Sequence, residues 1–190
     1  NTIKMRKLPI IFILLLAAVI PSCKLDPVTD AWEYYKEWRE GNQAWLEEQI
    51  AKKNDDGTPY YNKVTPEFDH NAYVLIRYLN DRSKTEGNLT PLTSSTVDVK
   101  YIGRTYDDVA FDSSYLNTSP ADSIYRTKVT DVIEGWTIAL TNMRVGDSCE
   151  VIVPYQYGYK NVTYGSIKPY SNLIFHVKLV DIPGYEKPAN

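Results

Sequence analysis

The chain has 190 residues, a formal net charge of −3 and a hydrophobic fraction of 43%. This length predicts one domain with appendages, and the weak charge gives no reason to expect nucleic acid as a partner. Tyrosine is enriched, with 16 Tyr against 4 Phe. Because tyrosine joins an apolar ring to a polar hydroxyl, this bias suits half-buried sheets and wet binding surfaces.

The N-terminal stretch is typical of an export signal. Three basic residues within the first seven precede an apolar run over 8–20, which is too short for a comfortable membrane span. The run ends just before Cys23, and an apolar residue, a small residue and then Cys resemble a bacterial lipoprotein cleavage site. The resemblance implies that residues 1–22 are removed as a signal peptide, that Cys23 carries lipid, and that 23–29 form a tether. A plain secretory signal with an incidental cysteine is the alternative.

The second cysteine has a structural interpretation. If Cys23 carries lipid, Cys149 has no partner for a disulfide within the mature chain. Cys149, Val151 and Val153 alternate along a predicted strand and therefore share one of its faces. We expect Cys149 to be a small buried hydrophobe and not a nucleophile.

A helix is predicted over about 30–53. Asp30 and Glu33 have the spacing of an N-terminal capping box, and Gly41 is expected to bend or interrupt the helix. We expect the helix to dock on its own domain, with a dimerisation or client-binding helix as the alternative. The residues expected on the docking stripe are Ala31, Tyr34, Trp38 and Trp45, flanked by Leu46 and Ile50.

A turn and two strands are predicted after this helix. Residues 54–57 read Asn-Asp-Asp-Gly, which is typical of a turn. Strands are expected over 60–64 and 73–79, and the polar stretch 81–91 is expected to be a loop. The helix and these strands make up a predicted extension over residues 30–93.

The remaining chain predicts strands and one short helix. Val97, Val99 and Tyr101 share a strand face, and a helix is expected over about 133–143. Its apolar positions are Ile133, Trp136, Leu140 and Met143, and the last strand faces inward through Leu173, Phe175, Val177 and Leu179. The fold class expected is therefore α+β, with an antiparallel sheet wrapped around one short helix.

Short segments in a fixed order give the most specific signal. They are VDVKYIG at 97–103 with FDSS at 111–114, VIEGW at 132–136, and GSIKP at 165–169 running into LIF at 173–175. Together they resemble the FKBP-type peptidyl-prolyl cis-trans isomerase domain. The resemblance implies an FKBP-like domain over 94–184, followed by a tail over 185–190.

The resemblance also implies a pocket between sheet and helix, lined by aromatic side chains that bind a proline ring. Taken one at a time, each of the aromatic residues below would be assigned to the hydrophobic core. It is the match of the segments in the family's order that favours a pocket. The catalytic residues implied are Tyr101, Phe111, Asp112, Trp136, Tyr159 and Phe175. The substrate-binding residues implied are Tyr125, Val132, Ile133 and Ile167.

Asp112 is the most informative of these residues, because a carboxylate beside an apolar cleft needs a reason. The resemblance implies that it orients Tyr101 or the twisting amide electrostatically. The alternative is a loop hydrogen bond made with Ser113 and Ser114.

Several positions depart from the family pattern. Asp108 replaces a usual turn glycine, Tyr125 stands where phenylalanine is usual, and Lys168 replaces a proline. The loop over 160–164 lacks the usual glycines. These changes fall on the rim and flap of the implied pocket, where substrate selectivity is set.

No cofactor or metal is expected, because rotation about an amide bond moves no proton off the substrate. Only His70 and His176 are present, so a metal site or a Ser-His-Asp site is not predicted. The partners expected are proline-containing polypeptide clients and the membrane through lipid on Cys23. A second copy bound through the N-terminal helix is the alternative to docking of that helix on its own domain.

Two functions remain open at this point. The first is a lipid-anchored prolyl isomerase of the bacterial cell envelope, periplasmic or surface-exposed, that assists the folding of exported proteins. The second is a non-catalytic peptide-binding or structural envelope lipoprotein that keeps the fold.

Overall fold

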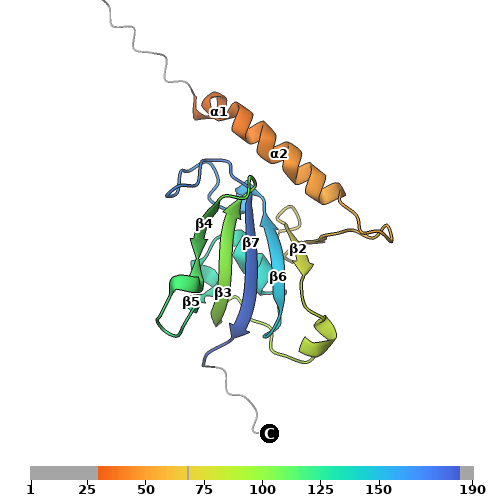
Figure 1. Ribbon diagram of the computed structural model, residues 1–190, viewed down its shortest axis with the longest axis vertical. Coiled ribbons are helices and arrows are strands. Elements are labelled where there is room, and N and C mark those ends of the chain that lie inside the picture. Colours follow the sequence, from red (N-terminus) through yellow and green to blue (C-terminus); the bar gives the residue numbers. More distant parts are fainter. Residues whose placement is uncertain (1–29, 68, 185–190) are drawn as a thin grey trace, which may run out of the picture.

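The computed structural model describes residues 30–67 and 69–184. Its architecture is one antiparallel sheet with a short helix against one face and a longer N-terminal helix across one end (Figure 1). The predicted signal peptide, Cys23, the tether and the tail over 185–190 lie outside the described residues. The strands are β1 (Asn62–Val64), β2 (Val74–Tyr78), β3 (Thr96–Thr105), β4 (Ala110–Ser113), β5 (Tyr125–Lys128), β6 (Ser148–Val153) and β7 (Leu173–Asp181).

The helices are few and short apart from one. They are α1 (Ala31–Tyr34), α2 (Lys36–Ala51) and α3 (Glu134–Leu140), with 3-10 turns η1 (Arg82–Thr85), η2 (Ser114–Leu116), η3 (Val129–Asp131) and η4 (Tyr155–Tyr157). Within the described ranges, no helix has the length and apolar character that a membrane crossing requires.

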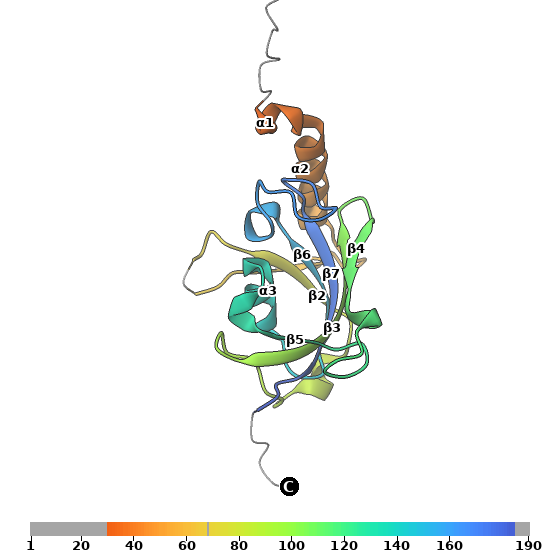
Figure 2. The ribbon, with the colours of Figure 1, turned by 90° about the vertical axis from the view of Figure 1, so that its left-hand side faces the viewer.

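The strand order is β1-β2-β6-β7-β3-β4, and β5 also pairs with β3. The neighbours on this path are antiparallel, and β3 pairs with β4 through its second half and with β5 through its first half. The strand predicted over 73–79 therefore extends the sheet as β2, next to β6. Figure 2 shows the sheet curving around α3, which lies in its concave face.

The core fills the space between α3 and the concave face. Alternating residues of β3, β6 and β7 point into it, and Val99, Val151 and Leu179 are fully buried. Gly135 lets α3 approach β6 closely, since a Cβ built there would lie 2.3 Å from Val153 Cγ1. The predicted α+β architecture is confirmed, with α3 shorter than the helix expected over 133–143.

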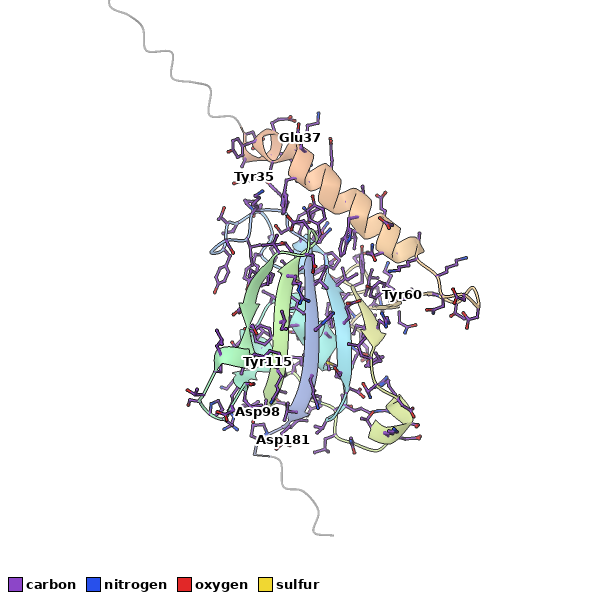
Figure 3. The ribbon with its side chains drawn as sticks, viewed as in Figure 1. Tyr35, Glu37, Tyr60, Asp98, Tyr115 and Asp181 are labelled. Atoms are coloured by element: carbon purple, nitrogen blue, oxygen red, sulfur yellow. The ribbon has the colours of Figure 1, made fainter. Side chains whose placement is uncertain are left out.

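The N-terminal helix differs from its prediction in two ways. The chain leaves helical geometry at Tyr35, which lies at the junction of α1 and α2 (Figure 3), whereas Gly41 stays inside a continuous α2. Asp30 caps α1 by accepting a hydrogen bond from the Trp32 amide at 3.2 Å. The predicted interruption at Gly41 is wrong, and Tyr106 packs over that glycine.

The predicted docking stripe is also wrong in part. The break at Tyr35 separates α1 from α2, so Ala31 and Tyr34 are exposed, and Ile50 is exposed as well. The buried residues of α2 are Asn42, Leu46 and Gln49, with Trp38 and Trp45 half-buried beside them. The helix docks on its own domain, where Leu46 packs with Leu75 and Ile152.

Candidate active site

A cavity of about 230 Å³ opens between α3 and the strands β3, β4, β5 and β7. Nine of the ten residues predicted for the pocket line it, together with two that were not predicted. The lining residues are Tyr101, Phe111, Asp112, Tyr125, Asp131, Val132, Ile133, Trp136, Tyr159, Tyr164 and Phe175. Ile167 differs, because its side chain is buried in the main core cluster instead of lining the cavity.

Trp136 forms the floor of this cavity. Its ring lies 5.0 Å from that of Tyr101 and 5.2 Å from that of Phe175, both edge-on. Phe111 extends the wall by an edge contact of 5.7 Å with Phe175. These edge-to-face contacts are the arrangement that aromatic quadrupoles favour.

Gly103 makes this arrangement possible from the sheet side. A Cβ at this position would lie 2.7 Å from Phe111 Cζ and 2.8 Å from Phe175 Cε1. Such distances are shorter than van der Waals contact, so a larger residue on β3 would push both rings away from their present positions.

Asp112 forms hydrogen bonds with both Tyr101 and Ser113. The Tyr101 hydroxyl donates to Asp112 Oδ2 at 2.5 Å, and the Ser113 amide donates to Asp112 Oδ1 at 2.8 Å. Burial, and then the bond to Asp112, raise the pKa of Tyr101 above its ordinary value. The phenol therefore keeps its proton at neutral pH and remains fixed between the sheet and the carboxylate.

Tyr159 and Tyr164 form the opposite rim. Their rings stack at 4.3 Å with an interplanar angle of 7°, and burial raises the pKa of Tyr159 to about 12. Tyr164 was not predicted, because its loop was considered only for the glycines it lacks. The sequence does contain a signal for it, because Tyr164 follows Tyr159 by five positions. A tight loop between them can bring the two aromatic rings into contact.

The remaining lining residues come from the segment before α3. Val132 and Ile133 lie between η3 and α3, and Asp131 ends η3 at the cavity. Asp131 was also not predicted. Tyr125 of β5 lies 5.7 Å from Tyr101, which places this position in the cavity despite the longer loop before it.

The two histidines lie away from the cavity lining. His176 is on the outer face of β7, where its Nε2 lies 2.7 Å from Glu150 Oε2. Tyr61 donates to the other oxygen of the same carboxylate at 2.5 Å. Over the described residues, no group of three or more His, Cys, Asp or Glu side chains is placed to hold a metal ion.

Comparisons with known proteins agree with this geometry. The family described as FKBP-type peptidyl-prolyl cis-trans isomerase matches residues 87–180. FkpA of Escherichia coli strain K12, an FKBP-type peptidyl-prolyl cis-trans isomerase, is 30% identical over 149 residues, which are 77% of this chain and 51% of FkpA. The chain thus spans about half the length of this relative.

A shorter relative is covered more fully. FK506-binding protein 2 of Debaryomyces hansenii is 33% identical over 114 residues, which are 60% of this chain and 80% of that protein.

Solved structures share the fold. A peptidyl-prolyl cis-trans isomerase from Pseudomonas syringae superposes with a TM-score of 0.60 at 23% identity, over 78% of this chain and 95% of that chain. The crystal structure of FkpA gives a TM-score of 0.60 at 25% identity, over 79% of this chain and 63% of that chain. Because of the family match and the coverage of the Debaryomyces hansenii relative, this chain belongs to the FKBP-type peptidyl-prolyl cis-trans isomerase family.

Proposed function

We propose that this chain catalyses the cis-trans isomerisation of X–Pro bonds in polypeptide clients. The observation that carries the proposal is the aromatic cavity above Trp136, with Tyr101 held by Asp112 on one side and Tyr159 on the other. Its volume of about 230 Å³ lies below the range of about 300–1,000 Å³ usual for drug-sized ligands, which suits a single side chain such as a proline ring.

The chemistry follows from the amide bond itself. Rotation about an X–Pro bond crosses a barrier of roughly 18–20 kcal/mol, because the C–N bond is partly double. The twisted amide loses this conjugation and its charge separation falls. A water-poor aromatic cavity therefore stabilises the twisted state more than the planar one, and only such a difference accelerates the reaction.

The side chains of the pocket take distinct roles in this proposal. Trp136, Phe111 and Phe175 grip the proline ring. The Tyr159 hydroxyl donates to a client carbonyl, and since its pKa is raised to about 12 it stays protonated and able to donate. Tyr101 and Asp112 fix the wall beside the twisting amide through their 2.5 Å hydrogen bond.

The clients are proposed to be exported proteins of a bacterial envelope. The support is the apolar run over 8–20 followed by Cys23, which is typical of a lipoprotein signal. Lipid on Cys23 would hold the isomerase at a membrane, where emerging chains are unfolded and their X–Pro bonds accessible.

A second candidate function is peptide binding without catalysis. The rim of the cavity favours it, because Tyr164 is exposed and stacked on Tyr159, and Lys168 turns away to Trp38. A binding protein of this kind would retain proline-containing peptides in the cavity without accelerating their isomerisation.

The test is a prolyl isomerisation assay on the full chain, held in a mild detergent, with a chromogenic X–Pro peptide. We expect activity above buffer and a loss of about tenfold or more in Asp112→Val, equal to about 1.4 kcal/mol or more. Asp55→Val is the matched control, since Asp55 is exposed in the 54–57 turn. Peptide binding with activity equal to buffer would favour the second candidate, and equal activity in both variants would show that the site is misplaced.

A further inference from the structure

We propose that α2 is a positioning element for the pocket, and that Asn42 holds the β6–β7 loop in the conformation that presents Tyr159. This loop, residues 154–172, follows β6 and carries both tyrosines of the rim. The inference rests on the proposed isomerase function and adds to it residues from outside the cavity. In Figure 1 the loop lies between α1–α2 and the end of the sheet.

The contact is made by two buried asparagines at the neck of the loop. Asn42 Oδ1 accepts a hydrogen bond from the Asn172 amide, and the Asn172 side chain donates to the Asn42 carbonyl, both at 2.7 Å. Each residue is only 1% exposed. Buried amides without partners are costly, so this reciprocal pair fixes α2 and the loop relative to each other.

Asn172 passes this constraint to the start of the loop. Its Oδ1 accepts a hydrogen bond from the Tyr155 amide at 2.9 Å, which joins the two ends of the loop. The Tyr155 carbonyl in turn accepts from the Lys160 amide at 2.9 Å, and the Lys160 carbonyl accepts from the Tyr170 amide at 2.7 Å. Tyr159 lies inside this set of bonds, so its position depends on the neck that Asn42 closes.

Trp38 holds the same loop one turn earlier along α2. Its Nε1 donates to Ser171 Oγ at 3.2 Å, and the Lys168 ammonium lies 4.2 Å from the centre of its ring. Ser171 Oγ also donates to the Lys168 carbonyl at 2.7 Å. Lys168 replaces a flap proline of the family pattern, and here it ties the flap to the helix by a cation–π contact.

The helix reaches the opposite wall of the pocket as well. Tyr106, in the β3–β4 hairpin, packs against Trp38 with ring centres 4.9 Å apart and against Trp45 at 6.1 Å. That hairpin leads into Phe111 and Asp112. One helix therefore contacts the supports of both walls, and this pattern is what a positioning element requires.

The test compares Asn42→Ala with Leu46→Ala in the full chain, held in a mild detergent. Both residues lie on the docked face of α2, but Leu46 belongs to a hydrophobic cluster with Leu75 and Ile152 that includes no residue of the loop, whereas Asn42 bonds to Asn172. We expect kcat/KM to fall about fivefold to tenfold in Asn42→Ala and to stay unchanged in Leu46→Ala below its unfolding temperature. Hydrogen exchange at the Tyr155 and Tyr170 amides should rise only in Asn42→Ala.

A double-mutant cycle with Tyr159→Phe decides whether Asn42 acts through Tyr159. If it does, Asn42→Ala costs less activity once the hydroxyl is absent, and the two losses are not additive. Trp38→Phe removes the indole N–H donor and keeps a smaller aromatic ring, and it should cost about twofold in activity. This variant keeps the test open should Asn42→Ala fail to fold.

The outcomes separate this inference from the proposed function. Additive losses, equal losses in Leu46→Ala, or full activity in both Asn42→Ala and Trp38→Phe would overturn the inference while leaving an active isomerase. A wild-type chain with no activity above buffer would overturn the isomerase proposal and this inference with it.

Discussion

The pocket and the α2 junction are both built from aromatic side chains, yet only the pocket leaves space for a ligand. We use α2 junction for Trp38, Asn42 and Trp45 together with Tyr106 and Ser171. At the junction the indole nitrogen of Trp38 donates to Ser171, and the Lys168 ammonium covers its ring. In the pocket the indole nitrogen of Trp136 is buried, and the described residues offer it no hydrogen-bond partner.

The difference shows that ring content alone does not define a binding site. The junction rings are satisfied by neighbours of their own chain and serve as a contact surface. The pocket rings meet edge-on around about 230 Å³ of space and retain a polar atom without a partner. A buried donor left unpaired costs about 1–3 kcal/mol, so its presence favours a functional reason for the arrangement.

The largest expected effect comes from removing the floor of the pocket. Trp136→Ala should lower the free energy of unfolding by about 3–5 kcal/mol, because the ring is 5% exposed and its loss leaves a cavity. Trp45→Ala at the junction, where the ring is half-buried, should cost less than half of this. Denaturant unfolding of both variants checks the comparison, and an equal or larger cost for Trp45→Ala would contradict it.

The second effect tests how tightly the pocket wall is packed. Gly103→Ala should cost about 1–3 kcal/mol of stability and reduce isomerase activity, because the new methyl group meets Phe111 and Phe175 at 2.7–2.8 Å. Stability and kcat/KM of the variant are the measurements. Unchanged values of both would show that the two rings can move freely, and the pocket would then not be preorganised.

Much of this pocket was predictable from the sequence, because the order of its short segments resembles that of the FKBP-type family and those segments lie on regular elements. Tyr101, Phe111 and Phe175 lie on strands, and Trp136 lies on a short helix whose position follows from its apolar spacing. A strand or helix fixes where its side chains point, so the local pattern carries over into three dimensions.

The junction and the loop were harder to predict for a physical reason. The bond between Asn42 and Asn172 joins residues 130 positions apart, and neither residue has a periodic apolar pattern that marks its burial. The break at Tyr35 was missed in the same way, since local propensity continued the helix through it. Tyr164 lies in an irregular loop, and only the folded loop brings it onto Tyr159.

The third prediction concerns how stability depends on pH. It distinguishes the pocket, whose tyrosines titrate, from the junction tryptophans, which do not. The pKa of Tyr101 is raised and that of Tyr159 is raised to about 12, whereas an unfolded tyrosine titrates near about 10. Their contribution to stability is therefore complete below pH of about 10 and is lost as the pH rises further.

The contribution of Tyr101 and Tyr159 to the free energy of unfolding should thus be flat up to pH of about 10 and fall above it, by about 1.4 kcal/mol per pH unit for each of the two. Tyr101→Phe should make this fall shallower. Isomerase activity should be level from about pH 7 to about pH 10, since both phenols keep their protons. An activity loss with a midpoint near pH 8 would contradict the raised pKa values.

The smallest expected effect is at Gly41, which lies beside Tyr106 of the α2 junction. It is the counterpart of Gly103 in the pocket wall. A Cβ at Gly41 would lie 2.8 Å from the Tyr106 hydroxyl oxygen, which is the far end of a side chain and can turn aside. Alanine also favours the helix by about 1 kcal/mol over glycine, so Gly41→Ala should change stability by less than about 0.5 kcal/mol. Because Tyr106 must shift, the same variant should alter the fluorescence of Trp38 and Trp45. A stability loss as large as that of Gly103→Ala would mean that the junction is packed as rigidly as the pocket, and the distinction between an adaptable contact surface and a preorganised cavity would fail.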